Sequence, residues 1–310
     1  MENELMLPEK LETWLSEEEL VIFLFHGVVS EFVHPVRNYT RKHIDAEMFE
    51  NCISRLSAKG KALSMDEVLD YCETGSNFPK FSYAITFDDG FENNISIGLP
   101  ILEKYEVPMM IYLTTRFVDE NGMSWIDRIE TAVEDSVHEL IYFYVTDENY
   151  KICNTDEKKY FLNEVRKSVK SNPSIRPDEI ADHICEQLIP DSPIISGDNQ
   201  LDLKLSWSQI NELKSHPLMS FGGHSHTHPI LSFLSERELS YEIDTSLNLL
   251  STKAAIQPTH YSYPEGLAHC YSDEVINQLK ERGVRCCPTA IEGKNNRGAN
   301  PFELRRVMVV

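Results

Sequence analysis

Short runs of apolar residues recur along the whole chain, each about the length of one β-strand. Seven such runs lie at 20–25, 81–87, 107–113, 219–221, 260–263, 284–286 and 304–310. Stretches with helical character separate them. This alternation of strand and helix is typical of parallel strands in an α/β protein.

The intervening helices are predicted at 46–58, 64–71, 95–105, 206–215, 235–251 and 272–282. Four of them begin with a serine, whose side-chain oxygen can cap the first turn: Ser64, Ser206, Ser235 and Ser272. The sequences "SMDE" and "SERE" also place an acidic residue three positions after the serine. That spacing indicates a capping box at two helix starts.

The segment 119–204 interrupts the strand and helix rhythm. It contains a helix-like stretch, a hairpin candidate that turns near 147–149, and two more helical stretches rich in charge. So long a connection inside a compact barrel or sheet is usually a functional lid or a small subdomain. We therefore expect a single domain over 1–310, with 119–204 inserted in it as a lid or subdomain.

The charge of the chain disfavours one class of partner. Against 29 Lys and Arg residues stand 50 Asp and Glu residues, which leaves a formal net charge of −21 with histidine neutral. Because nucleic acid is itself polyanionic, it is not an expected partner.

The cysteine pattern and the first residues of the chain indicate the cellular compartment. The seven cysteines are an odd number without a C-x-x-C pair, so they suggest neither a disulfide framework nor a cysteine zinc site. The start of the chain lacks a basic region, and its first apolar run is far shorter than the roughly 20 residues of a membrane span. The expectation is a cytoplasmic protein without a membrane span.

Two adjacent carboxylates, Asp88 and Asp89, follow the predicted strand at 81–87 and precede a glycine. Their repulsion must be offset, either by water at a surface turn or by a bound cation. An isolated Asp-Asp-Gly is more often a surface turn. The carboxyl end of a parallel strand, however, is where α/β folds build ligand sites.

Three histidines, His224, His226 and His228, follow another short predicted strand. On a helical turn the first and third would share a face, whereas in an extended segment all three would, so the two alternatives differ over His226. Two histidines and one carboxylate form a common catalytic zinc set. Asp89, His224 and His228 can supply it, and two such motifs at two strand ends favour a shared metal site over two incidental motifs.

These motifs resemble those of the polysaccharide deacetylases, carbohydrate esterase family 4. "TFDDG" at 86–90 and "HSHTH" at 224–228 are similar to the first two motifs of that family, and "YSYPEG" at 261–266 is similar to the third. "LFHGVV" and "LRRVMV" are similar to its first and last strands. The resemblance covers most of the chain, is weakest in 119–204, and implies an α/β fold, a distorted (β/α)7-8 barrel with a helical and hairpin insertion.

Carried over by position, Asp88 resembles the family's general base, while Asp89, His224 and His228 resemble its metal ligands. His226 falls on a variable position between them. A metal-bound water has a pKa of about 7, so a nearby carboxylate can take its proton at neutral pH. Alternation along the strand is expected to send the two adjacent carboxylates in different directions, which would keep Asp88 off the metal.

The third motif implies an oxyanion site. The resemblance places a backbone N–H at Tyr263, which would help the metal to stabilise the tetrahedral oxyanion. Pro264 is expected to fix the turn, and Gly266 to let the substrate approach the backbone.

Two departures from the family pattern concern proton transfer. The chain lacks the late L-x-H motif whose histidine protonates the leaving amine in many members, and His26 in "LFHGVV" is the expected substitute, as in members whose acid lies on the N-terminal strand. Ser262 stands where many members have an arginine that orients the base. We expect Arg306 to take this role, with Arg305 as the fallback; the alternative for His26 is a structural hydrogen bond at the barrel top.

The resemblance implies a metal-dependent hydrolase that removes an acetyl or other small acyl group from an N-acylated amino sugar. This sugar is expected to be an intermediate of cell-surface polysaccharide synthesis. Zn²⁺ is the expected ion, although Co²⁺, Ni²⁺, Mn²⁺ or iron would bind the same ligands. The alternatives are a deacylase acting on a non-sugar amide or ester, and a carbohydrate-binding barrel that keeps the metal without turnover.

Overall fold

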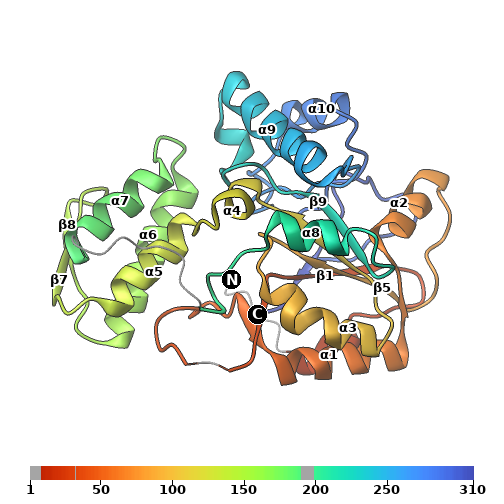
Figure 1. The fold of residues 1–310 in the computed structure, drawn as a ribbon, viewed down its shortest axis with the longest axis horizontal. Coiled ribbons are helices and arrows are strands. Elements are labelled where there is room, and N and C mark those ends of the chain that lie inside the picture. Colours follow the sequence, from red (N-terminus) through yellow and green to blue (C-terminus); the bar gives the residue numbers. More distant parts are fainter. Residues whose placement is uncertain (1–7, 32, 190–198) are drawn as a thin grey trace. The chain divides into compact units, whose positions relative to one another are not determined.

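The computed structural model describes residues 8–31, 33–189 and 199–310, and the chain forms two compact units (Figure 1). The first unit comprises Met1–Glu31, Lys42–Asn121 and Leu203–Val310, and the second comprises Phe32–Arg41 and Gly122–Asp202. Each unit has its own hydrophobic core.

A parallel sheet forms the centre of the first unit. Its strands follow the order β10-β1-β5-β6-β9, namely Val307–Met308, Val21–Phe25, Ser82–Phe87, Met109–Leu113 and Met219–Gly223, and β4 (Lys61–Ala62) pairs with the start of β5. The register of β1 against β5 pairs 21–25 with 83–87. A small parallel pair, β2 (Gly27–Val29) and β3 (His43–Asp45), lies outside this sheet.

Single bridges extend the sheet toward a closed barrel. Gly223 pairs in parallel with Tyr261, and His260 with Cys286. Hydrogen bonds from Thr289 N to Leu304 O (2.8 Å) and from Val309 N to Leu24 O (2.9 Å) continue the circuit back to β1. The strands expected at 260–263 and 284–286 are therefore single bridges rather than ladders.

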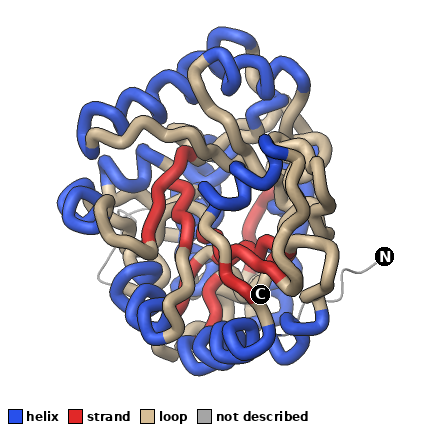
Figure 2. The backbone as a smooth tube through the Cα atoms, turned by 90° about the vertical axis from the view of Figure 1, so that its right-hand side faces the viewer, coloured by secondary structure: helices blue, strands red, loops and turns tan. Residues whose placement is uncertain are grey.

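The helices lie around the strands (Figure 2). They are α1 (Ala46–Lys59), α2 (Met65–Thr74), α3 (Leu99–Lys104), α4 (Thr115–Glu120), α8 (Trp207–Leu213), α9 (Glu236–Ala254) and α10 (Asp273–Glu281). Five of them begin within one residue of their predicted starts, whereas the helix at 115–120 was not predicted. The four predicted serine caps are all present, and the capping boxes at Ser64 and Ser235 are confirmed. The helix expected at 95–105 is divided, since a π turn, η2 (Asn94–Gly98), precedes α3.

Alternate residues of the strands pack into two different clusters. On β1, Val21, Phe23 and Phe25 join the layer beneath α1 and α3, whereas Ile22 joins the cluster that contains Tyr112 inside the barrel. Both faces are therefore buried, which explains why the strand sequences are apolar runs without polar alternation.

The second unit is built from α5 (Trp125–Asp135), α6 (Thr155–Ser171), α7 (Pro177–Leu188) and the antiparallel hairpin β7 (Leu140–Phe143) and β8 (Glu148–Lys151). Its core includes Ile129, Phe161 and Ile184. The inserted segment expected at 119–204 corresponds to most of this unit, to which the structure adds Phe32–Arg41. A role as a lid stays a prediction.

Among the described residues, no helix is long and apolar enough to cross a membrane.

Candidate functional site

The two adjacent carboxylates lie at the carboxyl end of β5, where the chain turns sharply. Asp88 still extends the ladder, because its N–H donates to Phe25 O at 3.0 Å. Asp89 has a φ of +74° and Gly90 one of +80°. The left-handed turn therefore separates the two side chains, not strand alternation as expected, and a non-glycine residue in this region is a feature typical of functional sites.

The histidine segment follows β9 and forms a bent turn, neither the helix nor the extended strand that the sequence left open. Ser225 and His228 have positive φ values, and His228 N donates to Ser225 Oγ at 2.9 Å. The carboxylate of Glu242 on α9 accepts the backbone N–H groups of His226 and Thr227 at 2.9 and 2.8 Å. This buried glutamate, which no sequence motif marked, fixes the turn.

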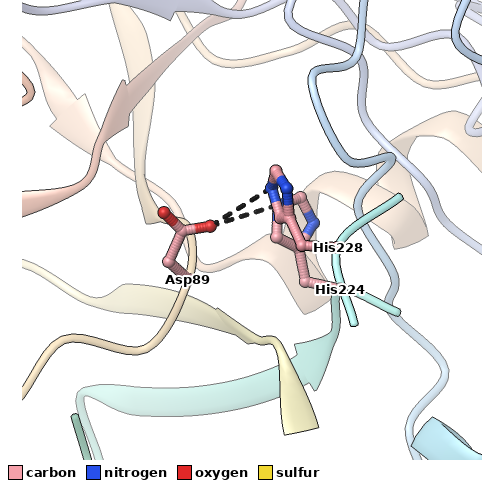
Figure 3. A group of neighbouring side chains, drawn as sticks. All are labelled: Asp89, His224 and His228. Carbon is pink, nitrogen blue, oxygen red and sulfur yellow. Dashed lines mark ion pairs between the residues drawn. The ribbon is translucent and has the colours of Figure 1, made fainter. Parts of the chain in front are cut away.

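Asp89, His224 and His228 bring three metal-capable atoms within 4.8 Å of one another (Figure 3). Asp89 Oδ1 lies 3.7 Å from His224 Nε2 and 3.4 Å from His228 Nε2. His224 Nδ1 lies 2.8 Å from Ser262 O, which can only accept, so Nδ1 carries the proton and Nε2 presents its lone pair.

The local environment fits a divalent ion. Asp89 Oδ1 is buried and has no hydrogen-bond partner within the described part of the chain, as expected for an oxygen whose partner is a metal. Burial lowers the pKa of His224, which keeps the imidazole neutral and able to ligate at neutral pH. The donor set of two imidazoles and one carboxylate is that of a catalytic zinc site.

His226 lies outside this group. Its ring Nδ1 lies 3.0 Å from Thr115 Oγ1, and the ring packs edge-on against Tyr241 with centroids 6.0 Å apart.

Asp88 makes a bidentate ion pair with Arg306. Arg306 Nη1 lies 2.8 Å from Asp88 Oδ1 and Nη2 lies 2.8 Å from Oδ2, while Nη2 also donates to Ser262 Oγ at 2.8 Å. The guanidinium is fully buried, and Nε donates to Thr289 O. The fallback, Arg305, donates instead to Glu292 O.

The charges around the carboxylates set their protonation. Burial by itself raises the pKa of Asp88, but the charge and hydrogen bonds of Arg306, together with His224 and His26, outweigh it, and the pKa lies below the usual carboxyl value. Burial likewise opposes ionisation of Asp89, whose pKa nevertheless falls well below the usual value because Lys42 and His228 face it. Lys42 Nζ lies 2.6 Å from Asp89 Oδ2, a contact that no motif indicated.

His26 follows β1 and is held by a hydrogen bond from Asn94 Nδ2 to its carbonyl at 2.7 Å. Its ring Nδ1 is buried without a hydrogen-bond partner among the described residues. Burial lowers the pKa of His26 to about 4, despite the opposing charge of Asp89. At neutral pH this imidazole is therefore uncharged.

The third motif contacts the same site through one peptide. The carbonyl of Ser262 is held by His224, which fixes the orientation of the peptide whose N–H belongs to Tyr263. The Tyr263 ring is buried, and its hydroxyl donates to Phe302 O. Gly266 has a positive φ, and a Cβ there would lie 2.5 Å from Ala290 N, so packing accounts for this glycine without the expected approach of substrate.

The arrangement gives the adjacent carboxylates different partners. Oδ1 of Asp89 faces the Nε2 atoms of two imidazoles and has no hydrogen-bond partner among the described residues, whereas both oxygens of Asp88 are held by one arginine, with Oδ2 also 3.8 Å from His224 Nε2. The first is suited to ligation and the second to accepting a proton close by.

Comparison with known proteins places these motifs in a family. The sequence profile of "Polysaccharide deacetylase" matches residues 75–287, more than half of the chain. Poly-beta-1,6-N-acetyl-D-glucosamine N-deacetylases of Staphylococcus aureus strains MSSA476 and MRSA252 are each 35% identical over 95 residues. That stretch is 30% of this chain and 31% of each relative, so the match spans about a third of the relatives' length.

Solved structures share the fold. Streptococcus pyogenes deacetylase PplD, in complex with acetate, matches with a TM-score of 0.60 and 15% identity, over 95% of this chain and 94% of that one. IcaB from Ammonifex degensii matches with a TM-score of 0.61 and 16% identity, over 96% and 94%. The predicted distorted barrel fold is thereby confirmed.

The geometry predicts which residues hold a metal. Asp89→Ala, His224→Ala and His228→Ala should each abolish stoichiometric zinc binding, because a ligand is lost. His226→Ala should retain it, since that ring faces Thr115 and Tyr241. Zinc content after dialysis, measured by mass spectrometry, checks this; loss of zinc in His226→Ala would contradict the assignment.

The buried ion pair predicts a pH-dependent effect of Arg306→Met. At pH 7 the uncompensated Asp88 charge should lower the free energy of unfolding by about 3–5 kcal/mol. Without Arg306, burial raises the pKa of Asp88, so the carboxylate protonates as the pH falls and the loss shrinks toward pH 4. Urea unfolding of the metal-free protein at both pH values measures this.

Arg305→Met is the matched control, because this neighbouring side chain is exposed and bonds Glu292 O instead of Asp88. It should change stability little at either pH. An equal loss at both pH values in Arg306→Met would show that Asp88 is not the charge left unpaired.

Proposed function

The chain belongs to the polysaccharide deacetylase family, and on this premise we propose that it is a metal-dependent hydrolase that removes the acetyl group from an N-acetylated amino sugar. The observation that carries the proposal is the division between the two adjacent carboxylates. One has an oxygen that faces two imidazoles and lacks a hydrogen-bond partner within the described segments, and the other is held by a buried arginine.

Asp89, His224 and His228 would hold the ion, and we propose zinc because of their donor types. When bound, such an ion supplies an acidified water and polarises the amide carbonyl. The Nδ1 bond of His224 to Ser262 O keeps that ring in the orientation and tautomer required for ligation.

Asp88 is proposed as the base that accepts the proton of the attacking water. Arg306 keeps this carboxylate ionised and orients both oxygens. Oδ2 also accepts from Ser262 Oγ at 3.5 Å, whereas Oδ1 accepts only from Arg306 among the described residues and retains a lone pair for the incoming proton. Because the same arginine lowers the pKa of Asp88, the carboxylate is a weak base. It is suited to a water that is already acidified, which agrees with dependence on a metal.

The water oxygen adds to the amide carbon, and the oxyanion then needs donors. The backbone N–H of Tyr263 is proposed for this role, since its peptide is fixed against a histidine of the same site.

When the carbon–nitrogen bond breaks, the leaving nitrogen takes a proton, for which we propose His26. With a pKa of about 4, this ring is neutral at rest. It can therefore donate only a proton gained during turnover, the one that Asp88 removed from water. Nδ1 of His26 is buried and has no hydrogen-bond partner among the described residues, which supports this role.

The proposed substrate is a saccharide containing N-acetylglucosamine, an intermediate of cell-surface polysaccharide synthesis. The support comes from the matched Staphylococcus aureus enzymes, whose names specify a poly-beta-1,6-N-acetyl-D-glucosamine.

The proposal predicts release of acetate from N-acetylglucosamine oligomers by the zinc-loaded protein, with loss of activity on chelation. Asp88→Asn should lower kcat by about 10²- to 10⁴-fold, the usual contribution of a general base. Zinc content should remain that of the parent protein. Acetate is measured by a coupled enzyme assay on β-1,6- and β-1,4-linked oligomers.

His226→Ala serves as the control for substitution near the metal, and it should keep the activity of the parent. Full activity in Asp88→Asn would remove Asp88 from the mechanism. Zinc binding without acetate release from any oligomer would leave a binding barrel as the better description.

A further inference from the structure

Lys42 is a charged residue at the site with no role in the mechanism above. It directly precedes β3, and its Nζ lies 2.6 Å from Asp89 Oδ2. The side chain is mostly buried, with 19% of its surface exposed, and its ammonium lies 4.9 Å from the centroid of the Phe91 ring.

The backbone that carries Lys42 is anchored. The next residue, His43, is buried, pairs with Gly27 across the small β2–β3 sheet, and packs edge-on against Phe91 with ring centroids 4.4 Å apart. Its Nδ1 also lies 3.0 Å from Asn93 Nδ2. Lys42 therefore extends from a fixed point, which favours a defined position for its ammonium.

The two oxygens of Asp89 have different surroundings. Oδ2 contacts the Lys42 ammonium, whereas Oδ1 faces the Nε2 atoms of His224 and His228 and has no hydrogen-bond partner in the described segments. A carboxylate can bind a metal through one oxygen or both, and the second oxygen would fill a position that a catalytic site keeps open for water and substrate.

We propose that Lys42 is a positioning residue that restricts Asp89 to a single-oxygen ligand. By holding Oδ2, the ammonium leaves only Oδ1 for the ion and keeps one coordination position open. This inference deepens the proposed function and rests on it.

The choice of lysine for Asp89 and arginine for Asp88 supports this. The Arg306 fork engages both oxygens of Asp88, including Oδ2, which lies 3.8 Å from His224 Nε2. An ammonium is a compact point charge that occupies one oxygen of its partner and leaves the other available. In this account, Arg306 suits Asp88 to act as the base, and Lys42 suits Asp89 to act as the metal ligand.

The test is the number of oxygen and nitrogen ligands in the zinc-loaded protein, measured by X-ray absorption, with the visible spectrum of the cobalt-loaded protein as a second readout. In Lys42→Met, Asp89 should bind through both oxygens, so the coordination number should rise by one and the cobalt absorption should weaken. Metal affinity or kcat/KM should fall by about 10- to 100-fold, the usual cost of losing a residue that orients a ligand.

Lys42→Arg tests whether contact with a single oxygen of Asp89, and not the positive charge alone, is what matters. It keeps the positive charge but introduces a fork that can take both oxygens, so zinc affinity should fall below that of the parent. A coordination number and affinity equal to the parent in Lys42→Arg would show that charge alone matters, which would overturn the positioning role.

Lys204→Met is the matched control, because Lys204 Nζ lies 3.4 Å from the centroid of the same Phe91 ring and forms no ion pair with Asp89 in the described residues. Its cobalt spectrum should equal that of the parent.

An unchanged coordination number in Lys42→Met contradicts the inference. Failure of the parent to release acetate would instead count against the proposed function, and the two failures are therefore distinguishable.

Discussion

The site depends on the buried pairing of Arg306 with Asp88. Two adjacent, buried carboxylates repel each other, and burial raises the pKa of each unless a cation faces it. Arg306 neutralises Asp88, and Lys42 neutralises Asp89 on the side away from the histidines. Metal is thus not required to offset the repulsion between them. The protein's own cations do so, and they leave one carboxylate oxygen free to face the histidines.

The barrel makes this pairing possible. Asp88 and Arg306 are 218 positions apart in the sequence, yet β10 lies beside β1, which in turn lies beside β5. Arg306 precedes β10 and reaches the carboxyl end of β5 through the barrel interior, with Thr289 O and Ser262 Oγ along its guanidinium. Removing either partner would leave a charge buried without compensation, so the closure of the sheet and the chemistry of the site are linked through one ion pair.

Much of this could be predicted from the sequence, because apolar runs and serine caps are local signals and the motifs are short. The strands at 20–25, 81–87 and 107–113, the capping boxes and the contact of Arg306 with Asp88 were all expected. The role of Gly266 in packing against Ala290 was not, since a glycine does not reveal which neighbour it must avoid.

Lys42 and Glu242 were missed for a related reason. Each contacts the site from an element that carries no motif, and a lysine in a loop or a glutamate on a helix looks like a solvated charge until the fold is known. The separation of the two aspartates was expected from strand alternation and arises from a left-handed turn at Asp89, which depends on backbone angles that residue types do not specify.

The most direct test of the account is an anomalous-scattering map, at the zinc edge, from crystals grown with zinc. The account predicts one peak bonded to Asp89 Oδ1, His224 Nε2 and His228 Nε2, with Asp88 still held by both nitrogens of the Arg306 fork. Zinc bonded to Asp88, or Asp88 released from Arg306, would contradict the division of labour between the two carboxylates.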